Sequence, residues 1–243
     1  MTRRTRRRLL LLGSAAAAAV SVPLWVPHLL AGLPAFRVSR IEVVGTRYVP
    51  PDEVVRLAAV DSTASVWDDP GIWEARVSSH RLIRQARVHR RGLRTLEIRV
   101  VEDRPVALAA TPLLVPVNAE GRLLPLDPAE ASLDLPLLAG TARIENGRLE
   151  SAGRRHLARV LGRLEEYDPA FTRGISEIGT LEGGAVEIRL VDAAHCARIL
   201  LPPDSPVLAL RRVEIALGAA GRRALLADAR FEGQVVLRLD GGA

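Results

Sequence analysis

Two pairs of neighbouring residues have side chains that an enzyme could use. His195 and Cys196 combine a base with a thiol nucleophile, and Glu102 and Asp103 combine two carboxylates. In an extended segment, however, adjacent side chains point to opposite faces, so neither pair can readily act on one substrate. We therefore predict a buried thiol beside a surface imidazole at the first pair, and a polar strand end with local ion pairing at the second.

The chain has no motif that binds a metal, a nucleotide or a cofactor. Its five histidines are scattered, Cys196 is the only cysteine, and no H-E-x-x-H or C-x-x-C sequence occurs. The phosphate-binding patterns G-x-x-x-x-G-K-[ST] and G-x-G-x-x-G are absent as well, and Gly183-Gly184 is typical of a turn. We predict a protein that is not an enzyme, takes no cofactor or metal, and is held together by its core without an intramolecular disulfide.

The net charge of +6 is concentrated at the N-terminus. No acidic residue occurs before Glu42, and residues 36–243 contain 29 arginines against 28 acidic residues. With aromatic residues at only 3%, the remainder has few rings on which bases could stack, so nucleic acid is not an expected partner. Five arginines supply almost all of the excess charge: Arg3, Arg4, Arg6, Arg7 and Arg8.

The arginine-rich start is followed by 18 residues without a charge, from Leu9 to Val26. As a helix they would span ~27 Å, close to the hydrocarbon core of a bilayer. Arginines on the cytoplasmic side are typical of a membrane anchor. We predict a cytoplasmic tail at residues 1–8 and a transmembrane helix at residues 9–33, with everything downstream outside the cytoplasm.

A cleaved export signal is the alternative reading of the same stretch. Thr5 to Leu10 resembles a twin-arginine motif, and the alanines from Ala15 to Ala19 could supply a small-residue cleavage site. Both readings place the rest of the chain outside the cytoplasm.

The first exported part has the pattern of a small α+β unit. A strand is predicted from Val38 to Gly45, followed by a helix that starts at the prolines of PPDEVVRLAA. A second helix is predicted from Ile72 to Ile83, with Ile72, Trp73, Val77 and Leu82 on its apolar side. Strands at Ala86–Arg90 and Thr95–Glu102 flank Gly92 and should form a hairpin. The order β-α-α-β-β predicts a three-stranded sheet with both helices on one face.

The second part alternates short strands with two helices. Strand-like runs occur in VALAA, LLVPV, NAEGRLLPL, SEIGTL, AVEIRL and CARILL, and Gly121 supports a tight turn. Helices are predicted from Ala152 to Tyr167 and from an N-cap at Ser205 to Gly218 or Gly221. A last half-buried strand is predicted from Asp228 to Leu239, at the edge of a sheet.

Three sequence patterns of the first part resemble one protein family. VSRIEVVG at residues 38–45 matches V-x-x-I-x-V-x-G, and TLEIRVVEDRP at 95–105 matches T-L-x-I-x-V-x-E-x-x-P. IRQARVHR at 83–90 follows V-x-x-A-x-V-x-R with Ile83 in the first position. In this order they resemble the FtsQ/DivIB bacterial cell-division proteins, which carry an FtsQ-type POTRA (polypeptide-transport-associated) domain. The resemblance implies a POTRA domain at 36–105, an FtsQ-type β domain at 106–243, and a scaffold in the inner membrane at the division septum.

The same resemblance implies a partner-binding site at the C-terminus. Asp228-Ala229-Arg230-Phe231 is similar to the family's D-x-R-[FY] segment, whose region binds the FtsB/FtsL coiled-coil pair. By this match Phe231 anchors the partner, Arg230 pairs with an acid of the partner, and backbone bonds come from Gln234 to Val236. The alternative is that Phe231 lies in the core and the strand only closes the sheet. The predicted site comprises Arg230, Phe231, Glu232, Gln234, Val235 and Val236.

Three further expectations concern the first part and the class of protein. The resemblance implies that the edge strand Val38–Val44 or its neighbouring helix is a candidate docking surface for other division proteins, unless Arg40 and Glu42 only keep that edge soluble. A soluble exported protein behind a twin-arginine signal and a POTRA-bearing export or assembly factor are the alternative functions. The assembly factor is disfavoured because no series of barrel-length strands follows.

Overall fold

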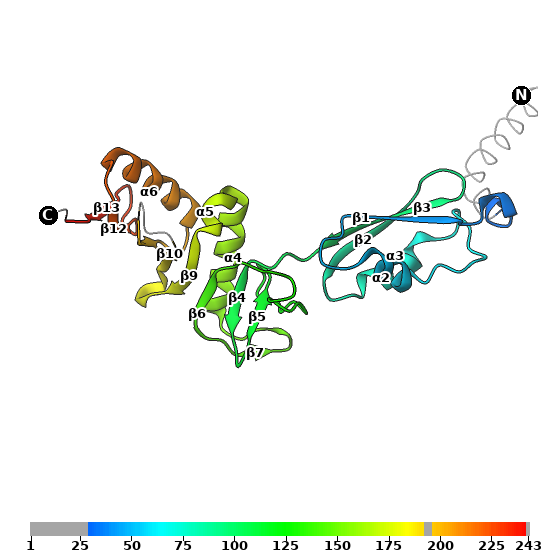
Figure 1. The fold of residues 1–243 in the computed structure, drawn as a ribbon, viewed down its shortest axis with the longest axis horizontal. Coiled ribbons are helices and arrows are strands. Elements are labelled where there is room, and N and C mark those ends of the chain that lie inside the picture. Colours follow the sequence, from blue (N-terminus) through cyan, green and yellow to red (C-terminus); the bar gives the residue numbers. More distant parts are fainter. Residues whose placement is uncertain (1–28, 192–195, 242–243) are drawn as a thin grey trace, which may run out of the picture. The chain divides into compact units, whose positions relative to one another are not determined.

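The computed structural model describes residues 29–191 and 196–241 (Figure 1). The chain forms two compact units, an N-terminal unit that ends at Glu102 and a C-terminal unit that begins at Asp103. Both units mix helices and strands, which confirms the α+β class. No helix within the described residues is long and apolar enough to cross a membrane. Residues 9–28 of the predicted anchor, and the five arginines before them, lie outside the described residues.

The N-terminal unit contains the predicted three-stranded sheet. After a short 3-10 turn, η1 (Pro34–Phe36), its elements are β1 (Arg40–Val44), α2 (Pro51–Ala58), α3 (Pro70–Ser78), β2 (Ile83–Arg90) and β3 (Thr95–Glu102). Among the described strands the order is β1-β3-β2, with β1 parallel and β2 antiparallel to β3. The β-α-α-β-β order and the hairpin around Gly92 are confirmed.

Gly45 has a steric role beyond ending the first strand. Its φ is +92°, in the left-handed region, and a Cβ at this position would collide with the carbonyl oxygen of Val100 in β3. The glycine of the V-x-x-I-x-V-x-G pattern therefore lets the chain leave β1 while it still lies against the neighbouring strand.

The second helix is shorter than predicted. It ends at Ser78 instead of Ile83, which is the first residue of β2. The Ser78 hydroxyl oxygen accepts a hydrogen bond from the backbone N–H of Ala86 (3.2 Å), so the helix end is tied to the strand. Leu82 and Ile83 are buried from the turn and the strand, whereas Ile72, predicted on the apolar side, is 54% exposed. The apolar residues keep helical spacing beyond Ser78, so the sequence pattern suggested a longer helix. Leu82 and Ile83 are buried by tertiary contacts although neither belongs to the helix.

The C-terminal unit is built on one large sheet. Within the described residues it has eight strands in the order β13-β12-β11-β10-β9-β6-β4-β5. Their bounds are β4 (Ala107–Ala110), β5 (Leu114–Val117), β6 (Leu137–Thr141), β9 (Ile175–Thr180), β10 (Val186–Leu190), β11 (Arg198–Leu201), β12 (Ala224–Asp228) and β13 (Val236–Leu239). A separate ribbon pairs β7 (Ile144–Glu145) with β8 (Arg148–Leu149), and η2 (Glu182–Gly184) joins β9 to β10.

One face of this sheet forms the core of the unit. A row of buried residues crosses five neighbouring strands and packs with leucines of α4 (Ala152–Tyr167) and α6 (Pro206–Ala220). The opposite face carries charged side chains, among them the pair Arg189–Glu177 (2.7 Å). The helices therefore cover one side of the sheet and leave the other polar. The row comprises Leu138, Ile178, Ile188, Ile199 and Ala227.

The two predicted helices of this unit are confirmed, whereas several of its shorter elements were not predicted. The helix α4 has both predicted ends, and α6 begins at Pro206, although Ser205 makes no side-chain capping bond. Pro169 begins the short helix α5 (Pro169–Arg173), which was not predicted and is capped by the Asp168 carboxylate. The strand β12 was missed because alanines and leucines carry no clear β-strand pattern.

Candidate partner-binding edge

The strand β13 is an outer strand of the large sheet (Figure 1). It pairs antiparallel with β12, placing Val236 opposite Asp228 and Leu237 opposite Ala227, and no other described strand lies beside it. The prediction that the last strand forms an edge of the sheet is therefore confirmed. An edge strand presents unpaired backbone groups that a strand of another chain can use.

The direction of the backbone groups along β13 follows from one hydrogen bond beyond its end. The N–H of Asp240 donates to the carbonyl oxygen of Arg223 (3.0 Å), on the side of β12. Backbone N–H groups alternate between the two sides of a strand. The N–H of Val236 therefore also points toward β12, whereas those of Leu237 and Leu239 point to the open edge.

The prediction of one strand from Asp228 to Leu239 is wrong. The strand β12 ends at Asp228, the chain turns at Gly233 (φ +72°), and β13 begins at Val236. The alternating apolar pattern runs through this turn, so it could not show that the chain reverses. Of the predicted site, Arg230, Phe231, Glu232 and Gln234 lie in the loop, Val235 directly precedes β13, and Val236 is its first residue.

Asp228 and Arg230 hold the start of this loop together. The Arg230 guanidinium donates to both carboxylate oxygens of Asp228, with Nε at 2.9 Å from Oδ1 and Nη2 at 2.7 Å from Oδ2. The backbone N–H of Arg230 also donates to Oδ1 (3.1 Å). The hydrogen bond from Arg230 is the main cause that lowers the pKa of Asp228, and the same bond raises the pKa of Arg230.

This contact changes the expected role of Arg230. The guanidinium already has a bidentate carboxylate partner within its own chain, and that geometry is the strongest that such a pair adopts. Asp228 was not among the predicted site residues. Its spacing of two residues from Arg230 was the available signal, because side chains at i and i+2 of an extended segment lie on one face.

Large apolar side chains around the loop are exposed. Phe231 and Val236 are each 52% exposed and Leu239 is 36% exposed, whereas Val235 and Leu237 pack partly against the core. The alternative that Phe231 is a core residue is therefore wrong. Exposed apolar side chains beside an open strand edge are typical of a surface that contacts another protein.

The opposite edge of the same sheet is covered. In β5 the carbonyl oxygen of Pro116 accepts a hydrogen bond from the N–H of Leu124 (2.9 Å). Directly after the strand, the N–H of Asn118 donates to the carbonyl oxygen of Arg122 (3.0 Å). Proline has no N–H to offer at this position. The returning chain and Pro116 thus block β5 against an added strand.

The strand β1 of the N-terminal unit also lies at an edge, as predicted. Its Glu42 forms an ion pair with Arg91 (3.1 Å), which also contacts Glu97 (2.9 Å). Arg40 is exposed. Whether other proteins dock on this edge stays a prediction.

Two of the residues that were considered as possible catalytic groups, Cys196 and Glu102, form hydrogen bonds within the fold. The buried thiol of Cys196 donates to the carbonyl oxygen of Arg198 (3.0 Å), and burial raises its pKa; His195 lies outside the described residues. Glu102 accepts hydrogen bonds from the N–H groups of Tyr48 and Val49 (2.8 and 3.0 Å).

Asp103 is buried in the C-terminal unit, with an oxygen 3.5 Å from the guanidinium of Arg122. The two neighbouring carboxylates therefore serve different units. The predicted polar strand end is confirmed, but Tyr48, Val49 and Arg122, which contact the two carboxylates, are distant in the sequence, so the predicted local ion pairing is not. No cluster of three potential metal ligands occurs in the described part of the chain.

Comparison with known proteins gives a consistent result. Residues 36–103 match the family described as POTRA domain, FtsQ-type. The chain is 34% identical over 221 residues to the cell division protein FtsQ of Rhodothermus marinus, covering 85% of this chain and 79% of that protein. It is 28% identical over 195 residues to the cell division protein FtsQ of Myxococcus fulvus, covering 77% of this chain and 67% of that protein.

Proposed function

Because the chain belongs to the FtsQ family of cell division proteins, we propose that it is a non-enzymatic scaffold that links early and late proteins of the bacterial division machinery. Similarity over most of the chain supports this role over a soluble exported protein or an outer-membrane assembly factor. The free β13 edge, with apolar side chains exposed beside it, is the observation that carries the proposal.

In this proposal residues 9–33 anchor the protein once in the inner membrane, at the division septum. The arginines of residues 1–8 stay in the cytoplasm, and residues 36–105 and 106–243 form the two extracytoplasmic domains. Intact Met1 on the protein recovered from the membrane fraction would support the anchor. A mature chain that starts after about residue 20 or 35 would instead indicate a cleaved signal.

The proposed partner at β13 is the coiled-coil pair FtsB/FtsL or a similar pair. A strand of the partner would add to the open edge, with affinity from backbone hydrogen bonds and specificity from side chains. Phe231 would anchor the partner from the loop. Asp228 would hold Arg230, and with it the loop, in the conformation that presents Phe231.

A pair of substitutions at Leu239 tests the strand addition. Leu239→Pro and Leu239→Ala both remove the leucine side chain, but only proline removes the N–H that points to the open edge. We expect Leu239→Pro to weaken binding of the partner pair roughly tenfold more than Leu239→Ala does, the equivalent of about one lost backbone hydrogen bond. Binding is measured on immobilised partner, with circular dichroism as the check on folding.

Equal affinities of two folded Leu239 variants would contradict strand addition at β13. Val236 is unsuitable for this test because its N–H points toward β12, so proline there would disturb the protein's own sheet.

We further propose that the β1 edge or its neighbouring helix docks other division proteins. Deleting residues 36–105 should abolish localisation at midcell while membrane insertion persists. Unchanged localisation would leave Arg40 and Glu42 with the role of keeping the edge soluble.

A further inference from the structure

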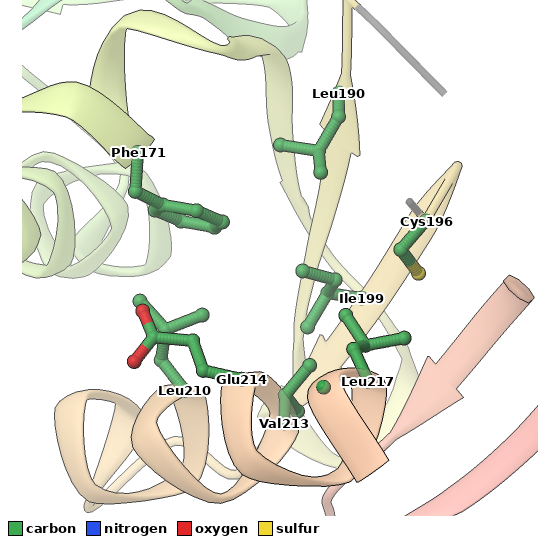
Figure 2. A pocket seen from close by; sticks show the side chains of 9 residues that line it. Phe171, Leu190, Cys196, Ile199, Leu210, Val213, Glu214 and Leu217 are labelled. Atoms are coloured by element: carbon green, nitrogen blue, oxygen red, sulfur yellow. The ribbon is translucent and has the colours of Figure 1, made fainter. Parts of the chain in front are cut away.

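An apolar cavity of about 330 Å³ lies within the C-terminal unit, between α6 and the sheet. Figure 2 shows Leu210, Val213 and Leu217 of α6 on one side and Leu190 and Ile199 of β10 and β11 on the other. Phe171 of α5 and the thiol of Cys196 complete the lining. The cavity is separate from the loop and the edge of β13 described above.

The cavity is partly open to solvent and is larger than the voids of a packed core. Cores are packed like organic crystals and contain few voids larger than a water molecule. Cavities that bind small molecules have volumes of about 300 to 1,000 Å³, an apolar lining and few polar groups. The cavity under α6 has both the volume and the composition of such a site.

One acidic side chain lies at the opening. Figure 2 shows Glu214 on the side of α6 that faces Phe171. The carboxylate accepts a hydrogen bond from the hydroxyl of Tyr167 (3.3 Å), and no ion pair joins it to another described residue. Gly218, one turn further along α6, is exposed at the same opening. Arg211, one turn before Glu214 on α6, acts electrostatically on Tyr167 but does not line the cavity. The lining itself therefore carries one negative charge and no positive one.

We propose that this cavity binds a small amphiphile whose apolar body fills the space under α6 and whose amine contacts Glu214. The apolar lining favours a hydrocarbon body. The carboxylate at the opening favours a positively charged head over a neutral one and disfavours a second carboxylate. Cys196 then lies under the bound molecule and reports on its presence.

The full chain contains a single thiol, which makes the test direct. The protein is placed in bilayer nanodiscs, and alkylation of Cys196 by N-ethylmaleimide is followed by intact mass. Octylamine, octanol and octanoate are compared as protecting probes at equal free concentration. We expect octylamine to protect at a concentration roughly tenfold lower than octanoate does, with octanol between them.

The length of the hydrocarbon body supplies a second readout. Within the series butylamine, hexylamine and octylamine, each added methylene should lower the protecting concentration about fourfold until the cavity is full. Glu214→Gln should remove the preference for the amine over the alcohol and keep the dependence on length. Equal protection by octylamine and octanoate in the wild-type chain would overturn the proposed head group.

Two leucine substitutions control for access to the thiol. An added Cβ at Gly218 meets no atom within 4 Å, so Gly218→Leu can be accommodated at the opening, where it should slow alkylation of Cys196. Ala219→Leu adds the same side chain to an exposed neighbour outside the lining and should leave alkylation unchanged. Alkylation at the same rate in both variants would show that the thiol is not reached through this cavity, and the proposal would fail.

Protection of Cys196 by the partner pair, with none by octylamine, would also overturn the proposal. The cavity would then hold a side chain of another protein.

Discussion

The two outer strands of the large sheet differ in how their backbone groups are used. Along β5, Pro116 offers no N–H and its carbonyl oxygen is bonded by the N–H of Leu124. Along β13 no described segment covers the edge, and Val236 and Leu239 are exposed on it. An unprotected edge is prone to unwanted strand pairing. An edge that stays open while the opposite edge of the same sheet is covered is best explained by a partner that binds it.

Among substitutions in the loop before β13, Phe231→Ala is expected to have the largest effect on partner affinity. The ring is 52% exposed, so its loss should leave the thermal stability of the protein nearly unchanged. If the ring anchors the partner, affinity should fall by roughly 10- to 100-fold, as for a central aromatic residue of an interface. Titration of the immobilised partner pair measures this loss.

Leu208→Ala is the matched control for Phe231→Ala. Leu208 is 66% exposed in the first turn of α6 and belongs neither to β13 nor to its loop, so its truncation should not change affinity. Equal affinities of the Phe231→Ala variant and the wild-type chain would remove the anchor from the proposal and leave only backbone pairing at the edge.

A smaller effect is expected from Asp228→Asn. The variant loses the charge that holds Arg230 through three side-chain hydrogen bonds, so the loop should present Phe231 less often. The pair is partly exposed, and we expect affinity to fall by about three- to tenfold. Leu239→Ala in the same background should add its own loss, because the loop and the edge contribute separately.

The pH dependence of this pair has a definite sign. Arg230 lowers the pKa of Asp228 below its ordinary value of 3.8, so the contact contributes stability above that value and loses it as the pH falls through the lowered pKa. Between pH 5 and 8 the carboxylate stays ionised, and the contribution of Asp228 to partner binding should not change. A loss of affinity near pH 6 that disappears in Asp228→Asn would contradict this assignment.

The smallest effect is expected at the covered edge. Pro116→Val restores an N–H to β5, but the chain at Leu124 still lies along that strand. Partner affinity should remain within about twofold of the wild-type value, because the added donor faces the protein's own backbone. A substantial change in affinity would show that both edges of the sheet take part in binding.

Local sequence signals were sufficient where they agreed with the tertiary structure. The strand Thr95–Glu102 has the predicted ends because strict alternation and a glycine turn specify it. The helix Ala152–Tyr167 has the predicted ends, and the structure shows that Ser151 caps its start while Asp168-Pro169 stops it. Gly45 was recognised as a strand end, although the reason it must be glycine lies in Val100, far away in the sequence.

The order of the strands and the partners of the polar groups depended on the tertiary structure. Alternating apolar residues continue through the turn at Gly233, so only the pairing of β13 with β12 showed that Phe231 lies in an exposed loop. Helical spacing continued to Ile83, but the tie between Ser78 and Ala86 ends the helix earlier.

The sequence by itself determined the α+β class, the two long helices, the hairpin of the N-terminal unit and the family to which the chain belongs, because these depend on local pattern. Only the tertiary structure decided that one sheet edge is open and the other covered, that Asp228 holds Arg230, and that a cavity lies under α6. Each of these depends on groups that are distant in the sequence or on which way a side chain points. Neither property is contained in the periodicity of a single segment.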